Sequence, residues 1–249
     1  WLVSRTLRRA GRILTDSYAS AGDLRARLRA PAERLRVVYL AADPRCRPLR
    51  DEERLEAARR RYALPAEFIL YLGGFDQRKN VAGLIRAYAA LRRRRPDAPA
   101  LILAGRLPER DSAFFPHPAR VAGEAGVSEW VHFAGWVPEE DKPALYSLAT
   151  IFAFPSLYEG FGLPLLEAMA CGAPVIAGRG SSTGEIVGPA GVLVEPSSDE
   201  ELAAALDALL DDEAERARLA AAGLARAAQF QWAEAARLTR EAYLEAMYS

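Results

Sequence analysis

The chain has 249 residues, 51% hydrophobic and 27% charged, and its 33 basic side chains balance 33 acidic ones. This length suits one large domain or two small ones, and zero net charge gives no support to a nucleic-acid or polyanion partner. No apolar run approaches the roughly 20 residues that span a bilayer. Two cysteines far apart in the sequence, Cys46 and Cys171, make no disulfide framework and suit a reducing compartment. The chain opens at Trp1 without methionine or a signal-peptide pattern, so we expect a fragment of a longer protein.

The first 40 residues predict two short strands and two helices. Residues 1–10 form an amphipathic helix with Leu2, Val3 and Leu7 opposite several arginines. Two interpretations fit this helix, a membrane-surface segment and an ordinary surface helix of a larger domain, and the second is favoured. A strand over 13–15, a helix over 18–28 and a strand over 35–40 follow, and a proline-containing linker covers 41–50.

From residue 51 onward, apolar runs alternate with helical segments. We expect a helix over 51–62, strands over 68–72, 101–104, 131–134, 151–154, 175–177 and 192–194, and helices over 81–94, 118–125, 141–148 and 164–170. Short β-rich runs separated by helices are typical of a parallel, doubly wound α/β sheet of the Rossmann-like class. Ligands of such sheets bind at the carboxyl ends of the strands. After Pro196 the chain is helical, over 200–210, 213–228 and 231–248.

A glycine pair follows the first of these buried strands. Gly73 and Gly74 allow a close approach of the backbone to a ligand, and Arg78 and Lys79 bring two positive charges within reach of a diphosphate. A plain strand-to-helix turn explains the same residues equally simply.

The run from Phe154 to Gly172 predicts a strand, a tight loop and a helix. Pro164 suits a first helical turn and Gly172 a helix end, so backbone N–H groups face the loop and favour an anion such as phosphate. Two carboxylates flank this loop, Glu159 before it and Glu167 within the helix. A structural turn with two incidental glutamates is the simpler interpretation. A glycoside hydrolase pair is a further one, although such an enzyme needs no diphosphate site.

The same run closely resembles the Glu-(seven residues)-Glu signature of retaining glycosyltransferases of the GT-B fold, family 4. The resemblance implies that Glu159 contacts the hydroxyls of the transferred sugar and that Glu167 accepts hydrogen bonds from both ribose hydroxyls. It further implies a donor-binding loop whose backbone N–H groups hold sugar and diphosphate oxygens. That loop comprises Gly160, Phe161, Gly162 and Leu163.

Other segments resemble the same family. The residues from Tyr71 to Asn80 match its second donor motif. The resemblance implies that Lys79 binds the donor diphosphate and that Lys79 and Glu159 are the catalytic residues. Many members have an arginine where this chain has Gly74, and the resemblance leaves open whether Arg78 replaces it. Trp136 and Val137 are expected beside the nucleotide base, although Trp136 also suits a core or cleft aromatic.

The loop 181–185 resembles one that touches the donor sugar or diphosphate, while Glu185 equally suits a cap for the next helix. The family likeness implies three parts. They are a remnant of the acceptor-side domain over 1–42, a donor-binding domain over 43–230 and a crossover helix over 231–249. The chain therefore corresponds to the C-terminal half of a GT-B enzyme.

The sequence is therefore interpreted as the donor-binding half of a retaining, metal-independent hexosyltransferase, poorly active in isolation. The donor is a GDP- or UDP-linked sugar, with mannosyl transfer favoured, and the acceptor is a hydroxyl of a glycan or lipid-linked glycan. No metal site and no cofactor are expected, and the location is cytoplasmic, with peripheral attachment at the cytoplasmic membrane face allowed. Two alternatives remain open: a non-catalytic nucleotide-sugar-binding module, and a GT-B-like epimerase of sugar nucleotides.

Overall fold

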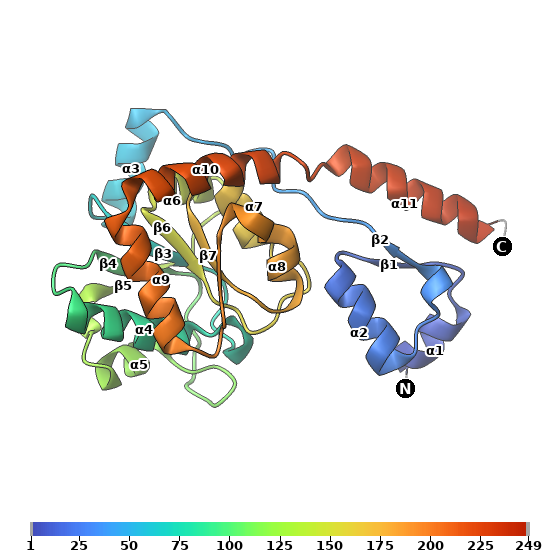
Figure 1. Ribbon diagram of the computed structural model, residues 1–249, viewed down its shortest axis with the longest axis horizontal. Helices are drawn as coiled ribbons and strands as arrows, with labels where there is room; N and C mark the ends of the chain where they lie inside the picture. Colours follow the sequence, from blue (N-terminus) through green and yellow to red (C-terminus); the bar gives the residue numbers. More distant parts are fainter. Residues whose placement is uncertain (1, 248–249) are drawn as a thin grey trace.

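A computed structural model describes residues 2–247, so the predictions for Trp1, Tyr248 and Ser249 lie outside the described residues. A parallel sheet of six strands in the order β5-β4-β3-β6-β7-β8 forms the centre of the larger part (Figure 1). The strands are β3 (Phe68–Leu72), β4 (Ala100–Ala104), β5 (Val131–Gly135), β6 (Ile151–Phe154), β7 (Val175–Gly178) and β8 (Val192–Val194). The predicted doubly wound α/β fold is confirmed.

Helices cover both faces of this sheet because its central strands carry apolar side chains on both sides. Every residue of β3, β6 and β7 is buried. On one side α4, α5 and α9 pack together, and on the other α3, α6, α7, α8 and α10 form a continuous layer. Their bounds are α3 (Glu52–Tyr62), α4 (Val81–Arg94), α5 (Pro118–Glu124), α6 (Lys142–Leu148), α7 (Leu163–Ala170), α8 (Ser181–Val187), α9 (Asp199–Asp211) and α10 (Glu213–Ala227).

The N-terminal residues form a small separate layer beside the main sheet. It contains α1 (Leu2–Arg9), β1 (Ile13–Thr15), α2 (Tyr18–Leu28) and β2 (Leu35–Val37), with β1 and β2 paired in parallel. The predicted strand over 35–40 is too long at its end. Val38 N–H still donates to Thr15 O at 2.8 Å, but β1 stops at Thr15 and offers no further partner.

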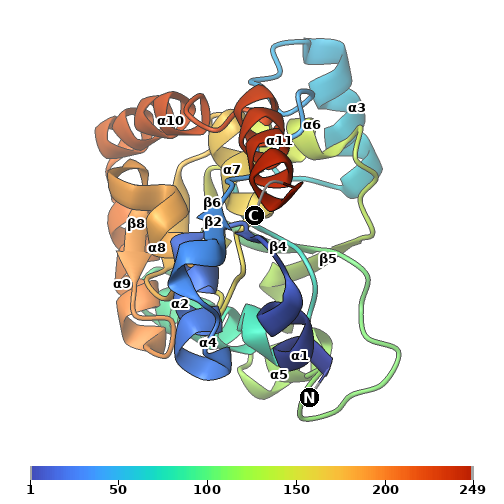
Figure 2. The same ribbon diagram turned by 90° about the vertical axis from the view of Figure 1, so that its right-hand side faces the viewer.

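The last helix, α11 (Trp232–Met247), returns from the main domain to this N-terminal layer (Figure 2). Glu245 near its end lies 2.6 Å from Arg12 and 3.0 Å from Arg36. The chain therefore crosses between the two layers twice, once through the linker and once through α11. The proposed domain limits at residues 42 and 230 stay a prediction.

One expectation about the fold requires correction. The segment 181–185 is not a loop, because it forms the first part of α8. The Cys46 side chain and burial raise the pKa of the Cys171 thiol, so the two cysteines lie near each other although they are far apart in the sequence. Both cysteines are free thiols. Within residues 2–247, no helix combines the length and the apolar character needed to cross a membrane.

Candidate functional site

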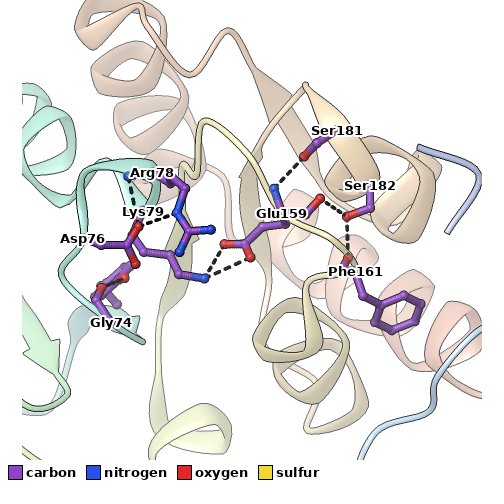
Figure 3. A network of polar contacts seen from close by, with 9 residues as sticks. Gly74, Asp76, Arg78, Lys79, Glu159, Phe161, Ser181 and Ser182 are labelled. Carbon is purple, nitrogen blue, oxygen red and sulfur yellow. Dashed lines mark hydrogen bonds and ion pairs between the residues drawn. The ribbon is translucent and has the colours of Figure 1, made fainter. Parts of the chain in front are cut away.

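The predicted motifs meet at the point where the strand order of the main sheet reverses. β3 and β6 are neighbours although β4 and β5 lie between them in the sequence. Their carboxyl ends lead into the 73–80 loop and the 155–162 loop, which therefore face each other (Figure 3). Such a reversal leaves a crevice in which doubly wound sheets bind their ligands.

Lys79 and Glu159 are paired between these two loops. Lys79 Nζ lies 2.7 Å from Glu159 Oε1 and 2.9 Å from Oε2, so the ammonium bridges both carboxylate oxygens. The side chains are 20% and 11% exposed, and the ammonium also lies 5.4 Å from the centre of the Phe154 ring. Two predicted site residues 80 positions apart are thus in direct contact, partly shielded from water.

Arg78 extends from the same short helical turn, Gln77–Lys79, toward the crevice. Its Nε donates to Asp76 Oδ1 at 2.8 Å, and Asp76 also caps the turn by accepting from Arg78 N–H. The Arg78 side chain is 58% exposed. Because Nε alone is engaged by Asp76, the terminal nitrogens of the guanidinium can serve a ligand. Figure 3 shows the group between Asp76 and Glu159.

The glycines of the 73–80 loop are explained by close backbone contacts. Tyr71 OH donates to Gly74 O, and a Cβ on Gly73 would lie 2.9 Å from that hydroxyl. Gly105, with φ of +146°, has no room for a Cβ against Gly73 O. Asn80 has φ of +54° and donates through Nδ2 to Pro155 O and Pro196 O, at 3.3 and 2.5 Å. Asn80 thereby ties the two loops together, a role that the sequence prediction did not assign.

Hydroxyl groups at the start of α8 hold the backbone of the glutamate loop. Glu159 N–H donates to Ser181 Oγ at 2.9 Å, and Ser182 Oγ donates to Glu159 O at 3.0 Å and to Phe161 O at 2.9 Å (Figure 3). Ser181 has φ of +54°, a strained value for a residue other than glycine. The serines of 181–185 therefore act on the protein backbone in this structure.

The amino terminus of α7 presents free backbone amides toward the loop. Leu165 and Leu166 N–H donate to Gly162 O, at 3.0 and 3.3 Å, so the amides before them have no acceptor within the helix. Gly162 has φ of +101°, which explains the glycine there. The Phe161 ring anchors the loop, with Tyr39 and Phe230 at 6.2 and 6.0 Å between ring centres.

Glu167 lies in a buried polar cluster. Tyr146 OH donates to its Oε2 at 3.0 Å, and Lys142 Nζ lies 3.8 Å from the same oxygen. Burial raises the pKa of the Glu167 carboxyl, while Lys142 and Tyr146 counteract this shift. The sequence prediction missed both partners, which lie on the helix preceding β6, outside the recognised motif.

The two residues expected beside a nucleotide base differ in their surroundings. Trp136 is 63% exposed, so it is not a core aromatic, and Val137 is 4% exposed. Val137 can therefore offer a ligand its backbone rather than its side chain. Both residues follow directly from β5 (Val131–Gly135).

One expectation was that Glu185 caps the helix that follows it, but its carboxylate instead binds the start of α2. It accepts hydrogen bonds from the first amides of α2, Tyr18 N–H at 2.9 Å and Ala19 N–H at 3.2 Å, and from Tyr39 OH at 2.6 Å. This bonding and burial raise the pKa of Tyr39, with burial the larger cause. Glu185 thus joins the main domain to the N-terminal layer.

Over the described range 2–247, no group of three or more His, Cys, Asp or Glu side chains is arranged to hold a metal ion. The positive charge at the crevice comes from Lys79, Arg78 and the α7 amino terminus. Such a site favours an anionic group.

Comparisons with known proteins agree with this geometry. Residues 56–226 match the family model described as glycosyl transferases group 1. The O-antigen chain mannosyltransferase B of Escherichia coli is 35% identical over 93% of this chain and 60% of its own length. The MMP alpha-(1->4)-mannosyltransferase of Mycolicibacterium hassiacum is 34% identical over 99% of this chain and 57% of its own.

A solved structure shares the fold over nearly the whole chain. Sucrose-phosphate synthase from Thermosynechococcus elongatus superposes with a TM-score of 0.82 at 28% identity, covering 98% of this chain and 60% of the synthase. The chain thus spans about 60% of the length of these relatives.

Proposed function

The chain belongs to the glycosyl transferases of group 1, and we propose that it forms the donor-binding half of a retaining transferase for nucleotide diphosphate sugars. The observation that carries this proposal is the pairing of Lys79 with Glu159 at the strand-order reversal, 2.7 Å apart and beside the α7 amino terminus. A carboxylate that seeks sugar hydroxyls is thereby placed next to cations that suit a diphosphate.

The donor's leaving group determines how we assign the positive charges. When the glycosidic bond to the diphosphate breaks, negative charge develops on the leaving oxygen. Lys79 Nζ and the free amides of Phe161, Gly162 and Leu163 are placed to stabilise that charge. Arg78 supplies the second side-chain cation, in place of the arginine that many family members have where this chain has Gly74.

The two glutamates serve different parts of the donor in this proposal. Glu159 accepts hydrogen bonds from the transferred sugar, and Glu167 accepts them from the ribose. An ionised carboxylate is an acceptor only, and a diol presents two donors, so each pairing is chemically matched. Val137 backbone and Trp136 border the base. We propose transfer without a metal ion, because side-chain and backbone charges already provide the stabilisation.

The substrate assignment rests on the names of the relatives. The E. coli and Mycolicibacterium relatives are described as mannosyltransferases. We therefore propose mannosyl transfer from a GDP- or UDP-linked donor to a hydroxyl of a glycan or lipid-linked acceptor. The proposed location is the cytoplasm, with the complete enzyme attached peripherally to the cytoplasmic membrane face. Polysaccharide or glycolipid synthesis is the corresponding role.

Isothermal calorimetry with GDP, UDP and ADP tests the donor site directly. We expect one of the three to bind the chain, and Lys79→Ala to weaken that binding about tenfold or more, the loss of one charged hydrogen bond. Failure of all three to bind would remove the donor-site proposal. Transfer by a full-length protein, followed by NMR of the product's anomeric configuration, separates a retaining transferase from an epimerase or a non-catalytic module.

A further inference from the structure

The chain uses lysine at two positions only. Of its 33 basic side chains, 31 are arginines, and the two lysines are Lys79 and Lys142. Lys79 forms an ion pair with Glu159, and Lys142 lies beside Glu167, so each lysine accompanies one glutamate of the signature. Both lysine side chains are largely shielded, with 20% and 16% exposed. In a chain that otherwise relies on arginine, this placement points to a similar task for the two lysines.

The surroundings of Lys142 suit an ammonium group. Its Nζ lies 2.6 Å from Glu139 Oε1 and 3.8 Å from Glu167 Oε2, so one small charge serves two carboxylates. An ammonium is a compact point charge, whereas a guanidinium is a wider, planar group whose donors form a fixed fork. Lys142 is the first residue of α6, and Glu167 lies in α7, which packs against α6. Lys142 therefore links the segment before α6 to the carboxylate of α7.

The cation and a tyrosine both act on the same oxygen of Glu167. Tyr146 OH donates to Oε2 at 3.0 Å, and Lys142 approaches that atom from the start of the same helix. Within residues 2–247, no hydrogen bond reaches Oε1 of Glu167. Oε1 is still open to solvent, since Ser156 Oγ is the one fully buried polar side-chain atom without a partner in that range. Oε1 is therefore the oxygen that a ligand can use.

The charge of Glu167 depends on Lys142, because the other groups around the carboxylate are acidic or neutral. Burial raises the pKa of this carboxyl, Lys142 and Tyr146 lower it, and the charges of Glu139 and Asp43 raise it. Across the described residues, Lys142 is the only cation within 4.0 Å of the carboxylate. The cluster is bordered by two thiols, those of Cys171 and Cys46.

We propose that Lys142 is a positioning residue for the nucleotide ribose, which holds Glu167 ionised and, with Tyr146, fixes its Oε2 so that Oε1 is presented to the ribose hydroxyls. The inference rests on the proposed role of Glu167 and adds the residue that prepares it. An ionised carboxylate accepts hydrogen bonds and donates none, which matches the hydroxyl donors of a ribose. Lys142 acts through Glu167 and does not itself contact the ribose.

Calorimetry with GDP and UDP and with their 2′-deoxy forms tests this role. The unmodified chain should prefer the ribonucleotide about tenfold, as for one charge-assisted hydrogen bond. In Lys142→Met this preference should shrink about threefold or more, and Lys142→Arg, which keeps the charge, should restore part of it. An unchanged preference in Lys142→Met, or an equal loss in both variants, would overturn the proposal. So would a change confined to the preference among GDP, UDP and ADP, because Lys142 would then serve the base.

A matched control separates the position of the charge from its loss. Arg120 on α5 also pairs with two carboxylates, Asp111 at 2.8 Å and Glu124 at 2.6 Å. Arg120→Met removes the same charge outside the proposed site, so the preference for the ribonucleotide should stay unchanged. A loss equal to that in Lys142→Met would show an effect of net charge and refute the specific role of Lys142.

Carbon-13 NMR titration of the Glu167 carboxyl, assigned with Glu167→Gln, tests the same inference without a nucleotide. Lys142→Met and Lys142→Gln should move the titration midpoint of Glu167 to higher pH, and Arg120→Met should not. An unmoved midpoint overturns the inference whether or not a nucleotide binds. If the midpoint moves but the unmodified chain binds no nucleotide, the donor proposal fails and only the control of Glu167 by Lys142 stands.

Discussion

The two glutamates of the signature should have opposite effects on the binding of a nucleoside diphosphate. Glu159 forms an ion pair with Lys79, the cation proposed to hold the diphosphate, at 2.7 Å. Glu159→Gln removes a negative charge from the site and releases that ammonium. GDP or UDP lacks the sugar that Glu159 is proposed to bind, so nothing is lost in exchange. The nucleotide should therefore bind more tightly.

The magnitude follows from the geometry of the pair. Two unit charges about 4 Å apart interact by about 4 kcal/mol at an effective dielectric of about 20. The Lys79 and Glu159 side chains are 20% and 11% exposed, so solvent screening and the retained amide contact reduce the effect. We expect about 1–2 kcal/mol, or binding about 5- to 30-fold tighter.

Glu167→Gln should act in the other direction. Its carboxylate is proposed to accept from ribose hydroxyls, and weakening one charge-assisted bond costs about 1.5 kcal/mol, about tenfold in affinity. Calorimetry of both variants with GDP and UDP measures the difference. Glu213→Gln, an exposed residue at the start of α10, is the control. Equal signs for the two variants, or weaker nucleotide binding by Glu159→Gln, would refute the assigned roles.

Four further predictions concern the supports of the site. Tyr146→Phe removes the hydrogen bond to Glu167 and raises the pKa of that carboxyl further. The free energy of unfolding should fall by about 1–3 kcal/mol at pH 8 and by less at pH 4, because low pH favours the protonated carboxyl; equal losses would contradict this. Burial already raises the pKa of Glu167, so the carboxylate is protonated more readily as the pH falls, and nucleotide binding should then weaken. Calorimetry across pH should find no such dependence in Glu167→Gln. Glu185→Ala should speed hydrogen exchange at the first amides of α2 about tenfold or more. Unchanged exchange would show that Glu185 does not hold these amides. Gly105→Ala should destabilise by more than about 1 kcal/mol in denaturant unfolding, because φ is +146° and a Cβ overlaps a carbonyl, whereas Gly22→Ala, inside α2 with open space, should be neutral or stabilising.

Most elements of the main domain could be predicted because its central strands are buried on both faces. Each therefore appears in the sequence as a short, continuous apolar run between helical segments. The loop predicted over 181–185 from the family resemblance was wrong, although Ser181, Ser182, Thr183 and Gly184 are also poor helix formers. Their helix depends on tertiary contacts. Ser182 and Thr183 are buried, and their hydroxyls bond to backbone carbonyls.

The residues of the candidate site were named from the sequence one by one, but the contacts between them were not predicted. Lys79 and Glu159 each lie in a recognisable motif, yet their contact depends on β3 lying next to β6, and strand order is not encoded in local pattern. Tyr146 shows the same limit. A tyrosine on an amphipathic helix fits a core position, and only the packing of α6 on α7 reveals that its hydroxyl serves Glu167.

The glutamate loop connects the two layers because it is held from three directions. Lys79 binds the Glu159 side chain, Ser181 and Ser182 bind the loop backbone, and Ser17 from the N-terminal layer donates to Gly160 O at 2.6 Å. A rotation of the N-terminal layer would therefore pull on the residue adjacent to Glu159. Glu185 limits that rotation by binding α2 from the donor side. The position of Glu159 is thus coupled to the placement of the N-terminal layer.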